Sequence, residues 1–373
     1  MTDVTAHSSN PTPAPERSTE PAHIREPARI AVIGAGLAGL IACRDLRQAG
    51  FHVTVFDKSR GSGGRLASKQ VNDSSWDMGA QFMRAHSAAF SDQLHDWQQA
   101  GLVQRWAVTP WVFRDDQLQP SDDGVARYVA TPRMTALSRA LLAQASAFVP
   151  STRIVRCENR GAAARPEWWL SDDQGVSHGP FEALLINTPP QQALPLLDRA
   201  SPAFNAARER IAGVDMLPCW SLLLTLNEPL PALPDALFVQ QGILSWVARN
   251  SSKPGRDSTH ESWVIHASHG WSRQHENSPR EQVQRDLLAA FGELTSAAQT
   301  GASFSDHTIR DQWLHRWLYA VPANPLRQGS LADEQQRLAV AGDWCADASL
   351  EGAWHSGQHA AQQLIALLTA ETL

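Results

Sequence analysis

The architecture of this chain is set by two neighbouring stretches, RIAVIGAGLAGL (Arg29 to Leu40) and FHVTVFD (Phe51 to Asp57). The apolar, β-branched RIAVI predicts a buried parallel strand, and FHVTVF predicts a second one. Between them, helical spacing over Leu40–Gln48 ends at Gly50, a residue typical of the position that follows a helix. The sequence therefore predicts a strand–turn–helix–strand unit of about 30 residues.

The turn of this unit carries a G-x-G-x-x-G pattern formed by Gly34, Gly36 and Gly39. In such a pattern the first glycine makes the tight turn, the second lets a pyrophosphate approach the backbone, and the third lets the helix pack on the strand. The helix N-terminus then attracts the phosphate charge. Asp57, at the end of the second strand, is placed to bind the ribose hydroxyls and to repel a 2′-phosphate. The unit predicts a dinucleotide site.

A second glycine loop, KSRGSGGR from Lys58 to Arg65, follows at once. Nicotinamide dehydrogenases need no such loop, whereas in flavoproteins of the two-dinucleotide-fold type a G-G-R segment crosses the pyrophosphate. We predict that Arg65 contacts the phosphates and that Gly64 allows their close approach. The run WDMGAQF, which ends in Gln81 and Phe82, places small residues where a flat isoalloxazine ring must enter.

Two further pieces lie near the end of the chain. Ala341–Trp344 (AGDW) ends a predicted strand, and Glu351–Trp354 (EGAW) opens a predicted helix. An acid at the end of such a strand, here Asp343, commonly binds ribityl hydroxyls. The N-terminus of the helix that EGAW opens would stabilise the negative charge of a reduced flavin. The predicted cofactor is therefore FAD, bound by Gly34, Gly36, Ala38, Gly39, Asp57, Lys58, Gly64, Arg65, Gln81, Phe82, Asp343, Glu351 and Ala353.

Runs typical of buried strands occur near both ends of the chain, whereas the middle alternates strand-like runs with turns. This pattern predicts an α/β fold. We expect a Rossmann-like FAD domain of the two-dinucleotide-binding type, interrupted by an α+β substrate domain on a mainly antiparallel sheet. Helices are predicted over 131–145, 278–292 and from 352 onward, and strands over 152–157, 167–170, 183–187, 220–226, 263–266 and 338–342. The predicted division gives a tail over 1–27, an FAD-binding domain over 28–85, 127–200 and 321–373, and a substrate domain over 86–126 and 201–320.

Composition narrows the class of protein. The 373 residues carry a formal net charge of −6, which gives no general attraction to nucleic acid. No apolar run is long enough to cross a bilayer, and residues 1–27 lack the apolar core of a secretory signal, so a cytoplasmic protein with a disordered tail is expected. The cysteines have neither metal-ligand nor redox-motif spacing, so no metal is expected; they are Cys43, Cys157, Cys219 and Cys345.

Taken together, the motifs resemble those of bacterial renalases, a branch of the amine-oxidase-like flavoprotein superfamily. The likeness rests on VIGAGLAGL, FDKSRGSGGR, DMGAQF and GDWCADASLEGAWHSGQHAA, and it covers nearly everything after the tail. It extends through the middle of the chain, where WVARNSSKPGRD, WVIHAS and HRWLYA also look like that family. These central segments are the most specific, because the glycine motifs alone fit any relative.

The resemblance implies oxidation of misreduced NAD(P)H, the isomers that carry their hydride at C2 or C6 of the nicotinamide ring. FAD would take the hydride and pass two electrons to O₂, giving NAD(P)⁺ and H₂O₂. By position, the family's FAD contacts fall on Ala38, Asp57, Arg65, Gln81 and Phe82. His266 and Trp317 look like pocket residues beside the flavin.

The chemistry of the residues is compatible with this function. Hydride loss from a dihydropyridine releases no proton, so the site needs orientation and no general base. Trp317 and Trp344 are candidate walls for the nicotinamide ring, whereas Trp271 is better explained by ordinary packing. His266 either hydrogen-bonds the substrate carboxamide or is a satisfied core histidine. We therefore take His266, Trp317 and Trp344 as the candidate catalytic residues.

The segment WVARNSSKPGRD (Trp246 to Asp257) also carries a group of basic residues. Arg249, Lys253 and Arg256 either meet the phosphates of a dinucleotide substrate or are solvated charges of a loop.

Three alternatives stay open. A flavin amine oxidase would act on a small amine or polyamine, but Tyr128 and Tyr319 are the only tyrosines, which disfavours a tyrosine cage. A desaturase-like or protoporphyrinogen-oxidase-like relative would need a long apolar tunnel, and a flavin-binding protein would show no turnover. In some amine oxidases a cysteine upstream of the last helix binds the flavin covalently. Val321–Leu331 contains no cysteine, so non-covalent FAD is predicted.

Overall fold

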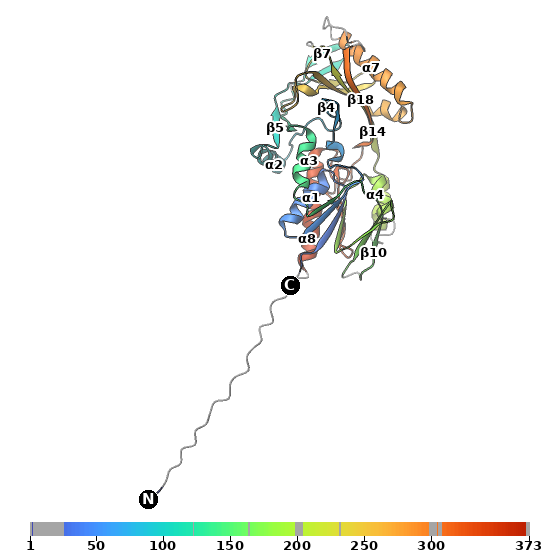
Figure 1. Ribbon diagram of the computed structural model, residues 1–373. Helices are drawn as coiled ribbons and strands as arrows, with labels where there is room; N and C mark the ends of the chain where they lie inside the picture. The colour runs from blue at the N-terminus through green and yellow to red at the C-terminus, as the bar shows by residue number, and fades with distance from the viewer. Residues whose placement is uncertain are drawn as a thin grey trace.

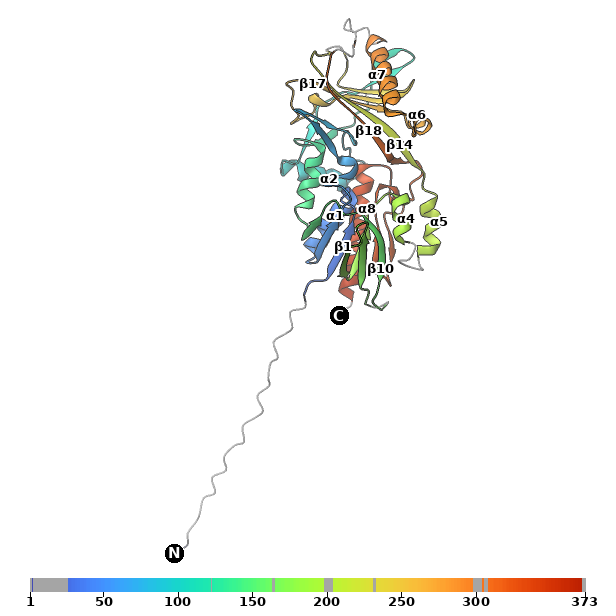
Figure 2. The same ribbon diagram turned by 45° about the vertical axis from the view of Figure 1, so that its right-hand side comes forward.

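The computed structural model describes residues 2, 26–121, 123–162, 165–197, 204–230, 233–297, 304 and 308–370. The predicted tail over 1–27 therefore lies outside the described residues, apart from residues 2, 26 and 27. Figures 1 and 2 show two layered bodies, one around a sheet that contains β1 and the other around a sheet that contains β14 and β18. The predicted α/β fold with a Rossmann-like unit is confirmed.

The first body is built on a six-stranded sheet of order β19-β20-β13-β1-β2-β9. Every neighbouring pair is parallel except β19 and β20. The inner strands β1, β2, β13 and β20 are apolar and almost wholly buried, as parallel strands covered on both faces are. Their bounds are β1 Arg29–Ile33, β2 His52–Phe56, β9 Ala147–Val149, β13 Ala183–Ile186, β19 Leu331–Asp333 and β20 Leu338–Val340.

Helices and a small sheet cover this parallel sheet. On one side, helices α1 (Leu37–Gln48), α3 (Met134–Leu142) and α8 (Leu350–Thr369) bury a shared apolar core. On the other side, a second apolar core lies between the parallel sheet and a layer made of an antiparallel sheet and two short helices. These elements are β10 Ile154–Asn159, β11 Trp168–Asp172, β12 Ser177–Phe181, α4 Pro190–Leu197 and α5 Asn205–Ala212.

The second body is a seven-stranded sheet of order β18-β14-β17-β16-β15-β6-β7, antiparallel except for the pair β15 and β6. Alternate residues of β14, including Leu222 and Leu224, pack with Leu287 and Phe291 of helix α7 on the outer face (Figure 2). The opposite face is left for the first body. The bounds are β6 Trp111–Arg114, β7 Gln117–Pro120, β14 Met216–Leu226, β15 Ala236–Val239, β16 Leu244–Arg249, β17 Glu261–Ala267, β18 Ile309–Pro322, α6 His269–Gln274 and α7 Arg280–Ala297.

Short elements join the two bodies. Strand β4 docks on the second sheet through the Trp76 indole, which donates to the carbonyl of Leu224. The remaining elements are β3 Ser68–Val71, β4 Ser74–Asp77, α2 Ala88–Gln99, β5 Val103–Trp106, β8 Arg127–Ala130 and the 3₁₀ turns η1 Gly64–Leu66, η3 Asn250–Ser252 and η5 Asp343–Cys345.

The element boundaries differ from the sequence prediction at several ends. Helix α8 begins at Leu350 because the Ser349 hydroxyl caps the backbone N–H of Gly352. Helix α7 runs five residues past the predicted Gly292, and helix α2 was not predicted. Each strand of the parallel sheet falls within the ranges predicted for the FAD-binding domain; the division into domains stays a prediction. None of the described helices combines the length and apolarity of a membrane span.

The contact between α1 and α8 depends on Gly357. A Cβ there would overlap the carbonyl oxygen of Ala38 and lie 3.0 Å from the Cβ of Ile41. We expect Gly357→Ala to lower the free energy of unfolding by about 1–3 kcal/mol, because backbone cannot move aside as a flexible side chain does. Denaturant unfolding measures this. The control is Gly270→Ala in α6, where nothing lies within 4 Å of the added Cβ; equal stability of both variants would contradict the packing argument.

Candidate active site and cofactor cavity

A cavity of about 1130 Å³ lies between the two bodies. The ends of four parallel strands open into it, at Ile33, Phe56, Asn187 and Gly342. The carboxyl ends of parallel strands are where open α/β sheets bind ligands. The face of the antiparallel sheet that α7 leaves uncovered forms the opposite wall.

The first glycine loop has no room for side chains. Gly34 has φ +103°, and a Cβ there would overlap the carbonyl oxygen of Asn187. A Cβ on Gly39 would lie 2.5 Å from the Gly34 oxygen, which agrees with its predicted role in close helix–strand packing. Helix α1 starts after Gly36 without a side-chain cap. Its first N–H groups are therefore available to a phosphate at the cavity edge.

Asp57 links the two glycine loops. One carboxylate oxygen accepts the N–H of Ala35 and the other accepts the N–H of Ser59, each at 2.7 Å. Lys58 follows on the cavity wall, where burial and the nearby Arg153 lower its pKa. This end of the cavity combines a fixed carboxylate with two cations, as the adenosine and phosphate part of a dinucleotide requires.

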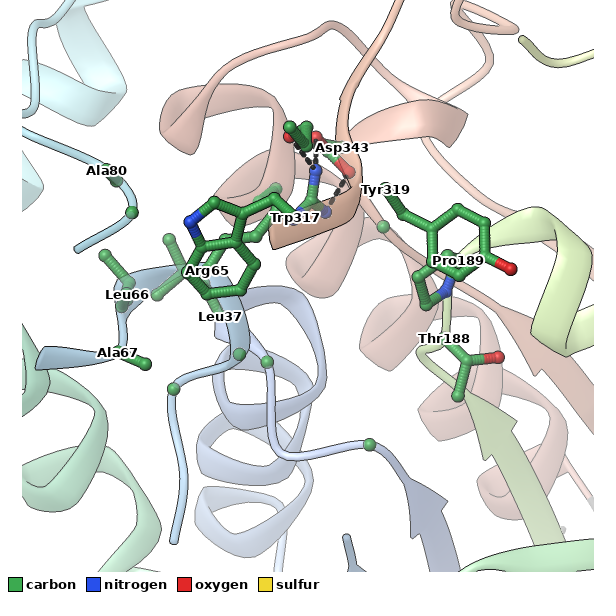
Figure 3. A pocket seen from close by; sticks show the side chains of 18 of the residues that line it. Leu37, Arg65, Leu66, Ala67, Ala80, Thr188, Pro189, Trp317, Tyr319 and Asp343 are labelled. Carbon is green, nitrogen blue, oxygen red and sulfur yellow. Dashed lines mark hydrogen bonds and ion pairs between the residues drawn. The ribbon is translucent and has the colours of Figure 1, made fainter. Parts of the chain in front are cut away.

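Arg65 and Asp343 meet on the cavity wall. Both terminal nitrogens of Arg65 donate to the carboxylate of Asp343, each at 2.6 Å, and one also donates to the Ala320 carbonyl at 3.0 Å (Figure 3). The backbone carbonyl of Arg65 accepts the N–H of Ala80. This bidentate pair joins the second glycine loop, the DMGAQF segment, β18 and the end of β20. The sequence predicted separate contacts of Arg65 and Asp343 with the cofactor but not their ion pair.

One row of side chains crosses the antiparallel sheet above the cavity. The strand register aligns His315 of β18, Ser221 of β14, His266 of β17, Trp246 of β16 and Phe238 of β15. All except Ser221 line the cavity. We call these five residues the roof row.

The two histidines of the roof row are uncharged at neutral pH. Burial lowers the pKa of His266 to about 4, and burial together with Arg280 and Lys69 lowers the pKa of His315 to about 4. The His266 ring hydrogen-bonds to the backbone of Met78, and its Nε2 is buried without a hydrogen-bond partner in the described part of the chain. His266 is therefore only half satisfied within the described part of the protein, and its Nε2 is shielded from the cavity.

The candidate tryptophans occupy different layers. Trp317 contacts the ring of His315 edge to face and donates its indole N–H to Met78 at 3.0 Å; Figure 3 places its ring beside Arg65. Trp344 also lines the cavity but is almost fully buried and donates to the Thr188 carbonyl. Trp271 stacks on a neighbouring histidine of its own helix and does not line the cavity, in agreement with a packing role.

A bulge in β18 shapes the wall next to Trp317. Leu217 pairs with Val321 and Cys219 pairs with Trp317, so three residues of β18 stand opposite Pro218 alone. Proline has no N–H to donate to a neighbouring strand. The unpaired segment Leu318–Ala320 turns to the cavity, where the Ala320 carbonyl accepts Arg65.

All but two of the predicted cofactor residues line the cavity. Gly39 lies behind it, and the Glu351 carboxylate accepts the N–H groups of His86 and Ser87 instead of facing it. Sequence reasoning missed Phe238, Trp246 and His315, because strand alternation is visible in the sequence but strand pairing is not. Those that do line the cavity are Gly34, Gly36, Ala38, Asp57, Lys58, Gly64, Arg65, Gln81, Phe82, Asp343 and Ala353.

The basic group Arg249, Lys253 and Arg256 does not line the cavity, and both readings of it were wrong. The side chains of Lys253 and Arg256 are 0% and 3% exposed and pair with Asp77, so they are neither phosphate contacts nor solvated charges.

The cavity fits the predicted FAD. Glycines without room for a Cβ, an uncapped helix N-terminus and the carboxylate of Asp57 lie in the order that a dinucleotide requires. Of the four cysteines, Cys219 lines the cavity, and burial raises its pKa to about 12.

We expect the FAD to be bound without a covalent link. Val321–Leu331 supplies no thiol, and the Cys219 thiol stays protonated at neutral pH. Acid precipitation of the purified yellow protein should release all the flavin into the supernatant, measured by its absorbance. Flavin colour that stays in the washed pellet would show that the prediction is wrong.

We expect Arg65→Ala to weaken FAD binding at least about tenfold, because a charge-assisted hydrogen bond contributes about 1.5–3 kcal/mol. The variant also leaves the Asp343 carboxylate unpaired on the cavity wall, and adding Asp343→Asn should recover part of the loss. Flavin retention on dialysis measures this. The control is Arg273→Ala, which removes an exposed ion pair with Asp215; unchanged flavin retention in Arg65→Ala would refute the assignment.

Family models place the chain among known proteins. Residues 32–96 match an NAD(P)-binding Rossmann-like domain, and residues 150–365 match flavin containing amine oxidoreductases. The zeta-carotene-forming phytoene desaturase of Myxococcus xanthus is 49% identical over 51 residues, which are 14% of this chain and 10% of that protein. Protoporphyrinogen oxidase 2 of Arabidopsis thaliana is 46% identical over 55 residues, 15% and 11% of the two chains. The matched stretch thus spans about a tenth of these curated relatives.

Solved structures share the fold along nearly the whole chain. A putative protoporphyrinogen oxidase from Exiguobacterium sp. 255-15 superposes with a TM-score of 0.71 at 11% identity, covering 91% of this chain and 98% of that one. Cyclohexylamine oxidase from Brevibacterium oxydans IH-35A gives 0.69 at 11% identity, covering 92% and 99%. With more than half of its length matched by the family model, the chain belongs to the flavin containing amine oxidoreductases, and its cofactor is FAD.

Proposed function

We propose that this flavin oxidoreductase oxidises the 2-dihydro and 6-dihydro isomers of NAD(P)H, regenerates NAD(P)⁺ and uses O₂ as its electron acceptor, as bacterial renalases do. The observation that most directly supports this substrate is the chemistry of the roof row. Above the cavity stand two neutral histidines and two aromatic rings, with Trp317 beside them. A flat, uncharged dihydropyridine ring suits such a surface.

The carboxylates of the cavity support the same choice. Among the described residues that line it, the acids are Asp57 and Asp343. Asp57 is held by two backbone N–H groups and Asp343 by Arg65. An ammonium substrate therefore meets no unpaired carboxylate among the described residues that line the cavity.

The residues have a simple task in this reaction. When bound, FAD supplies a two-electron acceptor for the hydride. Because hydride loss from the substrate ring leaves an aromatic pyridinium and no proton, no residue has to act as a base. The His266 ring, which lines the cavity, limits how the substrate ring can lie, and Trp317 provides a flat side wall.

The second candidate is a flavin amine oxidase acting on a small amine or polyamine. The family description and the fold shared with cyclohexylamine oxidase favour it. Trp246 and Trp317 are the aromatic surfaces that such a substrate would use.

The substrate is tested by flavin reduction without oxygen. We expect rapid bleaching of the flavin absorbance by the misreduced isomers, very slow bleaching by purified NADH or NADPH, and the slowest by amines. A ring placed with C2 or C6 at the flavin cannot also place C4 there. Faster reduction by ordinary NADH or by a polyamine would overturn the renalase-like function while leaving the family and the cofactor intact.

His266 and Trp317 should contribute orientation. We expect His266→Ala and Trp317→Ala to slow reduction of the flavin by the isomers about tenfold or more, and its reoxidation by O₂ much less. With a pKa near 4, His266 stays neutral, so the reduction rate should not fall between about pH 8 and about pH 6 through its protonation. Trp271→Phe, outside the cavity, is the control. Equal slowing of both half-reactions would contradict a role in substrate orientation.

A further inference from the structure

Behind the cavity wall lies a cluster of buried charges formed by Asp77, Lys253 and Arg256. Their side chains are 1%, 0% and 3% exposed. The Nζ of Lys253 is 3.3 Å and a terminal nitrogen of Arg256 is 2.5 Å from the same carboxylate oxygen of Asp77. The other oxygen of Asp77 accepts the Ser68 hydroxyl and the N–H of Met134.

The cluster contains two cations, Lys253 and Arg256, but a single carboxylate, that of Asp77. Arg256 alone neutralises Asp77, and it also donates to two backbone carbonyls, those of Ala130 and Pro254. Burying an ammonium without a carboxylate of its own costs free energy, and an apolar side chain of similar length would remove that cost. The pairing of Asp77 therefore does not by itself account for the positive charge of Lys253, which indicates a function.

The place of Lys253 indicates that function. Its ammonium donates to the side-chain oxygen of Gln81 at 3.0 Å, and the Gln81 amide in turn donates to the carbonyls of Asp77 and Gly79. The segment Met78–Phe82 lines the cavity, whereas Lys253 does not. The surplus charge thus lies one side chain behind the wall predicted to receive the flavin ring, where little water screens it.

We propose that Lys253 is a positioning residue whose surplus positive charge supports the negative charge that FAD gains on reduction, and so raises the reduction potential of the bound cofactor. Uptake of two electrons and one proton leaves reduced FAD with one additional negative charge. A fixed cation in a water-poor site stabilises such a charge without reorganisation. This inference requires FAD but not the proposed substrate.

The ionisation of Lys253 is consistent with this role. Burial and Arg256 lower its pKa to about 8, while Asp77 opposes the shift. The charged or titratable groups around it are Asp77, Arg256 and His266, and the positive charge of Lys253 contributes to the low pKa of His266. Because Lys253 is a base, it carries its charge below about pH 8 and loses it above. The ring of Trp106 closes the remaining side at 5.5 Å.

Three variants separate charge from hydrogen bonding. Lys253→Met removes both, Lys253→Gln keeps an N–H donor for Gln81, and Lys253→Arg keeps the charge. The midpoint potential of the FAD-loaded proteins is measured by titration with dithionite against a reference dye, which involves no substrate. We expect a more negative potential in Lys253→Met and Lys253→Gln at pH 7, and a value near that of the unaltered protein in Lys253→Arg.

The matched control is Arg249→Met. Arg249 lies four residues away, but it pairs with Glu261 and Asp235 and contacts Trp263 in the core on the outer face of the sheet. Its removal should leave the potential unchanged. An unchanged potential in Lys253→Met and Lys253→Gln would overturn the proposal. A shift in Lys253→Met alone would also overturn it, because the hydrogen bond to Gln81 would then be sufficient.

The unaltered protein gives a second measurement that requires no variant to fold. The part of the potential that depends on Lys253 should fade as the pH rises through about 8. Midpoint potentials measured across this range should therefore fall more steeply than below it. A constant slope through this range would count against a charged Lys253 in the oxidised protein and would overturn the proposal.

Discussion

The ion pair between Arg65 and Asp343 holds together the part of the cavity wall that the first body supplies. It joins residues 278 positions apart with two parallel hydrogen bonds. A planar guanidinium fixes both the distance and the angle of its partner, so the glycine loop and the end of β20 are held as one unit. The third contact, to the carbonyl of Ala320, adds the bulged strand β18 to the same point.

The two bodies divide the work around this point. The parallel sheet supplies what a dinucleotide needs, namely tight glycine turns, a helix N-terminus and Asp57. The antiparallel sheet supplies a surface of neutral rings, because its outer face is buried against α7 while the part of its inner face that Trp76 leaves uncovered borders the cavity. The first body is thus suited to hold the cofactor, while the roof row is the part of the site that can distinguish substrates.

The cofactor half of the site could be predicted from the sequence because its constraints are local. Gly39 is required by its contact with the Gly34 carbonyl five residues earlier, and Gly34 by the positive φ of the turn, so both leave a fixed spacing in the chain; the contact of Gly34 with the distant Asn187 adds to this. The roof row left no such trace. His315 and His266 become neighbours of Ser221 only through the pairing of β14 with β18 and β17, and alternation along one strand does not encode its partner.

The position of Lys253 was misread for a related reason. A lysine in a segment with proline and glycine is usually solvated, and only the fold shows that Asp77, 176 residues earlier, draws it inward. Glu351 was assigned to the flavin from its place in the last helix, whereas in the structure it binds the backbone of a distant loop. Both cases depend on long-range contacts.

The environment of Cys219 affects how easily its thiol is oxidised. An oxygen-consuming flavin enzyme, as proposed, forms hydrogen peroxide beside its own cavity wall, and Cys219 is part of that wall. Peroxide attacks thiolates, and burial raises the pKa of this thiol to about 12, which keeps it protonated. Cys219 therefore fills this part of the wall as a small apolar side chain that resists oxidation to a sulfenic acid.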